Sequence, residues 1–237
     1  SGNTVGTFIS LELLDKLKEL GNDKGATLFM TGLAVFQVLL SKYSRMEDFA
    51  VGSPIANRVK AELEPLIGFF VNTLTLRCHA SKEITFNEFL EQVKNTTLDA
   101  YANQDVPFER LVEEVNPQRS RSHTPLFQVM YSITNTPLNL PAIPGIQVQG
   151  MGESQSVAKF DLNFTMSEGG TGARLFAEYN TDLFDEVTVQ RMLQHYQLIL
   201  EQVVKNPTLR IGDIGLLTEA EYRQQISSQA IGDISFS

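Results

Sequence analysis

The chain of 237 residues is poor in the residues on which many catalytic and binding sites depend. Its single cysteine, Cys78, excludes a disulfide within the chain, which suits a reducing cytoplasm, and we expect a cytoplasmic location. The three histidines, His79, His123 and His195, lie far apart, and none has a partner at metal-ligand spacing. These scarcities argue against a disulfide-stabilised secreted domain and against a metal site.

Positive charge and long apolar runs are also scarce. The formal net charge is −9, so the chain lacks the basic surface expected of a nucleic-acid binder. The longest apolar segment, residues 28–40, is too short for a membrane span of roughly 20 residues, and it predicts a buried core helix. No secretory signal is visible at the N-terminus. We therefore expect neither a nucleic acid nor a membrane as a partner.

Familiar catalytic motifs are missing as well. The stretch VGSPI lacks the second glycine of a G-x-S-x-G nucleophile elbow, and no G-x-x-x-x-G-K-[ST] phosphate loop occurs. The glycines at 169–172 predict the tip of a hairpin. No recognisable histidine context accompanies Cys78, so we do not expect a reactive nucleophile there.

What the chain does contain is an alternation of helical and extended segments, with 42% hydrophobic residues. This pattern predicts one α/β unit with a mixed β-sheet flanked by helices. We expect helices at 11–20, 28–43, 86–102, about 107–115 and 186–205, with Ser10, Thr27, Thr85 and Asp185 as N-caps. We expect strands at 5–9, from 48 to a break at Gly52 and Pro54, and at 67–77, 126–134, 157–166 and 174–181.

One predicted strand, IGFFVNTLTLR at 67–77, has a polar residue in its apolar row. Strand side chains alternate between two faces, so Asn72 shares a face with Phe70, Leu74 and Leu76. A buried amide without partners costs roughly 1–3 kcal/mol. Either neighbouring groups satisfy Asn72, or its face opens onto something polar, such as a substrate channel.

Two other segments carry polar residues with more than one interpretation. In NQDVPFERLVEEV, Asp105 fits a helix cap or a polar group at the rim of a cleft, and Pro107 fits a first helical turn. Phe108, Leu111, Val112 and Val115 form the apolar stripe that we expect this helix to bury. In RSRSH, Arg119 and Arg121 are solvated loop charges or contacts to an acidic partner.

Taken together, three segments resemble a known family. IGFFVNTLTLR at 67–77, NQDVPFERLVE at 103–113 and RSRSHTPLFQVMYS at 119–132 resemble, in order and spacing, the later core motifs of condensation domains of nonribosomal peptide synthetases. The resemblance implies a lobe with the chloramphenicol acetyltransferase fold. It also implies that residues 1–217 form the C-terminal lobe of a condensation domain and that 218–237 begin the linker towards an adenylation domain.

The chain departs from the family at its catalytic motif, HHxxxDG, because no His-His pair occurs in the sequence. In the family this motif lies in the N-terminal lobe. The resemblance therefore implies a fragment of a peptide-bond-forming acyltransferase that holds no catalytic residue and is inactive alone.

The resemblance also implies partners and a site. The partners would be the N-terminal lobe, peptidyl carrier domains and the adenylation domain. Phosphopantetheine would be presented by the carrier domains, with no cofactor bound directly by this chain. The wall of the substrate tunnel would include Asn72, Thr73, Gln104, Asp105, Pro107, Arg119 and His123. Part of the region 137–182 would cross to the other lobe, and the apolar surface left without that lobe would be exposed or hidden in a dimer.

Two alternatives remain open from the sequence. The chain could be a docking module that holds a carrier domain without chemistry. It could also be a self-sufficient acyltransferase with His123 as its base, which requires His123 to face a formed pocket.

Overall fold

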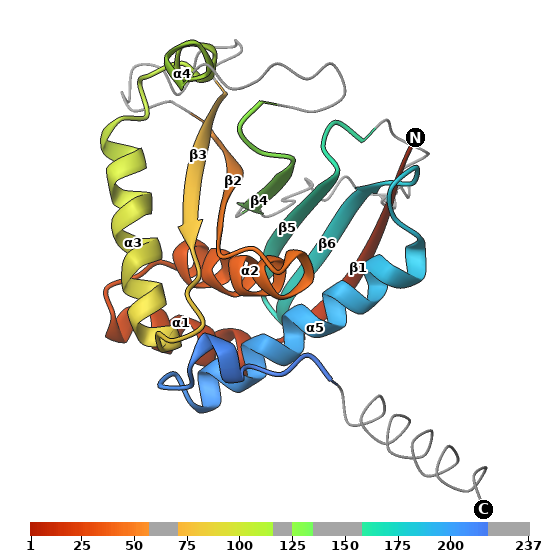
Figure 1. Ribbon diagram of the computed structural model, residues 1–237. Coiled ribbons are helices and arrows are strands. Elements are labelled where there is room, and N and C mark those ends of the chain that lie inside the picture. The colour runs from red at the N-terminus through yellow and green to blue at the C-terminus, as the bar shows by residue number, and fades with distance from the viewer. Residues whose placement is uncertain (57–70, 116–124, 135–157, 218–237) are drawn as a thin grey trace, which may run out of the picture.

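A computed structural model describes residues 1–56, 71–115, 125–134 and 158–217 of the chain. These residues form an α/β unit in which a β-sheet is packed against a layer of helices (Figure 1). The strands are β1 (Gly2–Ser10), β2 (Asp48–Ile55), β3 (Asn72–His79), β4 (Val129–Thr134), β5 (Leu162–Gly169) and β6 (Gly172–Asn180). The helices are α1 (Leu11–Asp23), α2 (Leu28–Ser44), α3 (Phe86–Ala102), α4 (Phe108–Val115) and α5 (Glu186–Lys205), with a short 3-10 turn at Ile211–Asp213.

The six strands form one mixed sheet in the order β1-β6-β5-β4-β2-β3, which confirms the predicted fold class. Strand β4 pairs in parallel with β2 and with β5. The other pairs, β1 with β6, β6 with β5 and β2 with β3, are antiparallel. Between β2 and β4, the described residues form a single bridge, which joins Gly52 to Met130. Strands β2 and β4 are therefore joined by one bridge only in the described part of the chain, and a pocket described below lies beside this bridge.

The predicted helix starts are confirmed because local hydrogen bonds fix them. The side chains of Ser10 and Thr27 accept from the backbone N–H groups of Leu13 and Met30. At α3, Thr85 and Glu88 form the reciprocal capping box that their spacing predicts. Asp185 precedes α5 as expected, but its side chain makes no capping hydrogen bond.

One face of the sheet and the helices α1, α2, α3 and α5 enclose the core (Figure 1). Alternation along β5 shows the two faces: Leu162, Phe164 and Met166 are buried, whereas Asn163 and Thr165 are only partly covered. Helix α2 is buried almost all round, as its uniform apolar sequence predicts. The helix layer therefore takes up one face of the sheet, and on β5 the other face carries polar side chains such as Asn163 and Thr165.

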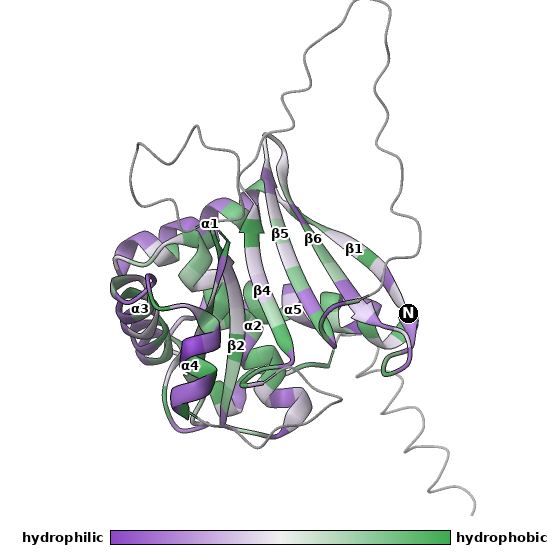
Figure 2. Ribbon diagram, turned by 90° about the horizontal axis from the view of Figure 1, so that it is seen from above, coloured by the Kyte–Doolittle hydropathy of each residue, from purple (hydrophilic) through white to green (hydrophobic). Residues whose placement is uncertain are grey.

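Some predicted boundaries are wrong. Strand β2 continues through Gly52 and Pro54, which we expected to break it. Pro54 lies beyond the bridge to β4, where β2 has no pairing with β4 in the described residues. The missing N–H of proline therefore costs no hydrogen bond to β4. Helix α4 forms, yet none of its residues is buried, and Val115 is 56% exposed. In Figure 2 this helix carries both hydrophilic and hydrophobic colours, as its amphipathic sequence implies.

The segment after α5 is fastened to the rest of the unit by backbone pairing. Backbone N–H groups of Phe86 and Asn87 donate to the carbonyls of Leu209 and Pro207. Both the donor and the acceptor of the Gln202 amide bond the backbone of Gly215. Ile211 and Ile214 are buried in the core. These contacts hold the chain to the packed unit as far as Gly215, and the predicted linker at 218–237 lies outside the described residues.

Among the described residues, no single helix is long and apolar enough to cross a membrane. Helices α1 and α2 reach the necessary length and composition only as a pair, and the pair is bent by 103°. Both helices pack within the core of the lobe.

Candidate functional site

The predicted tunnel residues that the structure describes gather where β3 begins and where α3 turns into α4. Asn72 is the first residue of β3, and its side chain points at this turn. Its amide nitrogen donates to the carbonyl oxygens of Gln104 and Val106, at 2.9 Å each. The strand start and the turn are therefore held together by one side chain.

The carbonyl oxygen of the Asn72 amide is used as well. It accepts from the backbone N–H of Thr73 at 2.9 Å and from that of Phe108 at 3.2 Å. Phe108 opens α4, so Asn72 caps this helix from 36 positions earlier in the chain. All four hydrogen-bonding positions of the amide are filled. Of the two alternatives left open by the sequence, the structure favours satisfaction by neighbours.

The other members of this cluster lie at its surface. Gln104 is half-buried and its side chain donates to the carbonyl of Tyr101 at 2.9 Å. Asp105 is exposed, and among the described residues its carboxylate caps no helix, because Asn72 performs that role. The carbonyl of Pro107 accepts from Arg110 and Leu111, so this proline lies at the helix entry as predicted.

Of the remaining predicted residues, Thr73 adjoins this cluster through its backbone N–H, which bonds Asn72, and the others lie outside the described ranges. Thr73 is half-buried and pairs with Pro54 across the β2–β3 ladder. Arg119 and His123 lie outside the described residues, as do residues 137–157 of the expected crossing. The described remainder of that region, residues 158–182, stays with this sheet, because it contains β5 and β6, which are internal strands.

The structure also describes the environments of the other two histidines and of the cysteine. His79 is exposed at the end of the edge strand β3, and His195 is buried with its Nδ1 hydrogen-bonded to the Tyr43 hydroxyl at 2.8 Å. Burial raises the pKa of the Cys78 thiol to about 12, so the thiol stays protonated at neutral pH. The described residues contain no cluster of three or more groups that could hold a metal ion.

A small aromatic cluster joins α4 to the face of the sheet that lies away from the helix layer. Phe127 is 1% exposed, and its ring centroid lies 5.4 Å from that of Phe108 and 5.9 Å from that of Phe160. A side-chain carbon at Gly52 would overlap the ring of Phe127. Gly52 therefore marks a close approach of this ring and does not break the strand as its sequence context suggests.

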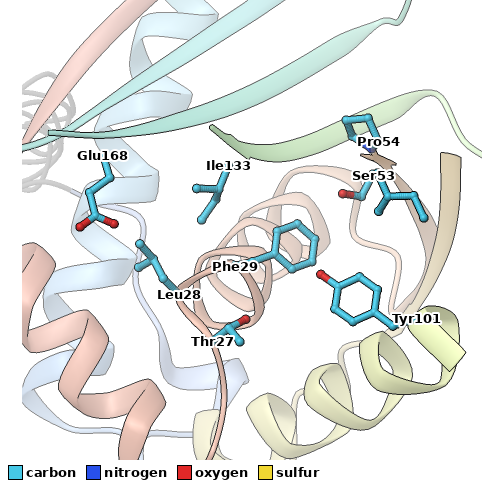
Figure 3. A pocket seen from close by; sticks show the side chains of 9 residues that line it. Thr27, Leu28, Phe29, Ser53, Pro54, Tyr101, Ile133 and Glu168 are labelled. Carbon is cyan, nitrogen blue, oxygen red and sulfur yellow. The ribbon is translucent and has the colours of Figure 1, made fainter. Parts of the chain in front are cut away.

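No local sequence pattern indicates a pocket that lies between the sheet and the helix layer (Figure 3). Its volume is about 360 Å³, and it lies where β2 and β4 run on beyond their bridge without pairing. Phe29 of α2, Ser53 of β2, Tyr101 of α3 and Ile133 of β4 are among the residues that line it. Because these four residues come from separate parts of the chain, only the fold reveals the pocket.

The sheet order, the helix layer on one face and the antiparallel edge strands are the fold of condensation domains. The X-domain from teicoplanin biosynthesis superposes with a TM-score of 0.83 at 25% identity, over 92% of this chain and 50% of that one. A four-domain nonribosomal peptide synthetase, holo-AB3403, gives a TM-score of 0.82 at 24% identity, over 94% of this chain and 18% of that one.

Sequence comparison reaches the same family. The sequence profile described as Condensation domain matches residues 1–226, and the chain belongs to this family. It is 49% identical over 218 residues to a linear gramicidin synthase of Brevibacillus parabrevis, and 40% identical over 220 residues to bacitracin synthase 1 of Bacillus licheniformis. These stretches cover 91% and 93% of this chain but only 4% of each relative. The chain therefore spans a small part of the curated relatives it matches.

Proposed function

We propose that this chain is the C-terminal half of a condensation domain that forms peptide bonds between carrier-bound thioesters in nonribosomal peptide synthesis. One observation carries the proposal: the family profile covers residues 1–226, while the chain accounts for about half of a single-domain relative such as the X-domain. The missing half would be the N-terminal lobe that holds the HHxxxDG motif. Adenylation and carrier domains would be further partners, in the cytoplasm, with residues 218–237 as the linker.

In this reaction the α-amine of one carrier-bound amino acid attacks the thioester carbonyl of another. The new C–N bond replaces the C–S bond, the pantetheine thiol leaves with a proton, and the amine loses one. The phosphopantetheine arms belong to the substrates. This chain would supply one wall of the tunnel, where holding amine and carbonyl in contact contributes much of the rate. Proton handling would fall to a histidine of the missing lobe, since no His-His pair occurs here.

Within that wall, the cluster at Asn72 has a positioning role. Its hydrogen bonds fix the turn that carries Gln104, Asp105 and Pro107 relative to the sheet. We propose that this turn and Thr73 border the tunnel, and that Arg119 and His123 lie near it. Asn72 would then act on substrates through the backbone it holds in place.

The lack of the histidine motif is also consistent with a second function, in which the chain docks a carrier domain without chemistry. Reconstitution separates the two. The chain is mixed with a separately produced N-terminal lobe that contains HHxxxDG, and with one donor and one acceptor carrier, each loaded with its amino acid. We expect dipeptide, detected by mass spectrometry, from the mixture and from neither piece alone. A stable complex without turnover would favour the docking function, and turnover by this chain alone would contradict both.

A further inference from the structure

The pocket in Figure 3 lies where an open α/β sheet most readily binds a ligand. Strands β2, β4 and β5 run in the same direction, and the pocket lies near their carboxyl ends, where Ile55, Ile133 and Glu168 line it. In open parallel sheets ligands bind in crevices outside these ends. The N-terminal turn of α2, with Leu28 and Phe29, forms the opposite wall. The crevice exists because β2 and β4 share a single bridge.

Two hydroxyl groups, those of Ser53 and Tyr101, face the pocket, and its other lining residues are apolar except for Thr27 and Glu168. Ser53 is 2% exposed, and Figure 3 shows its oxygen and the Tyr101 oxygen both turned towards the Phe29 ring. Among the described residues neither hydroxyl has a hydrogen-bond partner. Burial raises the pKa of Tyr101, so its hydroxyl keeps its proton at neutral pH and remains a donor. The Ser53 hydroxyl is buried, and buried hydroxyls are normally satisfied, so it is suited to bond a guest. Tyr101 is half-buried, and its hydroxyl faces the same pocket.

The charges around the pocket balance. Glu168 is paired with Lys18, so its carboxylate adds no net charge. The first turn of α2 contains no acidic residue. Within the described part of the chain, the backbone N–H groups of Leu28 and Phe29 also lack partners, as expected at a helix start. The pocket therefore combines apolar walls with several hydrogen-bond donors, which suits a neutral group that carries an acceptor oxygen.

We propose that this pocket binds an uncharged, largely apolar acyl group. Its hydrocarbon part lies against Phe29 and Ile133, and its carbonyl oxygen accepts from the hydroxyls of Ser53 and Tyr101. The identity of the acyl group rests on the proposed function: it would be the acyl part of a thioester held on a carrier domain. The binding itself needs only the pocket, so it can be tested without peptide-bond formation.

The probe is the N-acetylcysteamine thioester of isovaleric acid, added to the 237-residue chain with its isoleucine methyl groups labelled for NMR. We expect saturable shifts at Ile55 and Ile133, which line the pocket, and none at Ile199 and Ile211 in the core. Ser53→Ala and Tyr101→Phe each remove one hydroxyl and should raise the Kd about 3- to 10-fold. Ser132→Ala, which removes a hydroxyl from the other face of β4, should leave it unchanged. Circular dichroism checks that each variant is folded.

Three results would overturn the proposal. One is the lack of shifts at Ile55 and Ile133 at millimolar probe. Another is an unchanged Kd in both hydroxyl variants. The third is equal affinity for isovalerate, which would mean that the start of α2 binds an anion instead of a neutral carbonyl. None of these depends on turnover. Failed reconstitution together with positive binding would refute the proposed function alone, and the reverse combination would refute the pocket alone.

Discussion

At the scale of single residues, Asn72 shows how a polar group in an apolar row of a strand can be explained by contacts distant in sequence. Its amide bonds backbone groups at 104, 106 and 108, and all of these lie more than 30 residues away. Sequence reasoning expected Asn72 to lie near the segment of Gln104 and Pro107, and the structure brings these segments together. It could not choose between a satisfied amide and a ligand contact, because that depends on which backbone groups the fold brings within about 3 Å.

Two substitutions at Asn72 separate the hydrogen bonds that its amide donates from those that it accepts. Asn72→Ala removes all of them, and we expect it to lower the free energy of unfolding by roughly 1–3 kcal/mol in urea titrations. It should also speed amide hydrogen exchange at Phe108, because the cap of α4 is lost.

Asn72→Asp is the matched control. It keeps an oxygen for the Phe108 N–H but sets a carboxylate against the carbonyls of Gln104 and Val106. We expect a loss of stability with protection at Phe108 retained. Equal exchange rates at Phe108 in both variants would rule out the capping role.

At the scale of elements, helix α2 illustrates how packing overrides helix propensity. Gly32 lies in the middle of α2, where alanine is intrinsically better by about 1 kcal/mol. A side-chain carbon there would overlap the Tyr131 hydroxyl. That hydroxyl lies 3.3 Å from the one of Tyr196, which in turn donates to the Gly32 carbonyl. The glycine lets the helix approach two buried tyrosines closely enough to satisfy them.

We therefore expect Gly32→Ala to destabilise the chain by roughly 1–3 kcal/mol, measured as the free energy of unfolding in urea, because overpacking outweighs the gain in propensity. Gly170→Ala is the control. It lies at the hairpin tip with no atom within 4 Å of the added carbon, so its effect should stay within about 0.5 kcal/mol. Greater stability in Gly32→Ala would show that α2 shifts freely on the sheet.

Elements with strong local signals were predicted well. Helix starts at Ser10, Thr27 and Thr85 depend on hydrogen bonds within four residues, and the alternation along β5 follows from a half-covered sheet. Errors arose where distant contacts decide. Gly52 accommodates Phe127 instead of ending β2, and the apolar stripe of α4 is only half-buried, with Val115 exposed.

At the scale of the whole molecule, helices α1, α2, α3 and α5 cover one face of the sheet. On the other face, Phe8 is 49% exposed and Phe176, on the adjoining strand β6, is 36% exposed. The sequence-based expectation of exposed apolar surface agrees with these two rings. Under the proposed function, this face is available to the N-terminal lobe.

The double substitution Phe8→Ser with Phe176→Ser tests that role. We expect it to weaken association with a separately produced N-terminal lobe about tenfold or more, measured by calorimetry, because two exposed aromatic contacts are lost. Leu183→Ser, at a residue that is 57% exposed outside the sheet, should leave the affinity unchanged. Equal affinities for both variants would place the interface elsewhere on the lobe.

The sequence by itself determined the family, the α/β class, the helix caps and the lack of a histidine pair, because each of these is written in residue types or in short-range spacing. Only the tertiary structure decided how Asn72 is satisfied, why Gly52 is required and where a pocket opens between β2 and β4. These features depend on contacts between segments far apart in the chain. Such contacts form only once the sheet order is set and the hydrophobic core fixes the helices upon it.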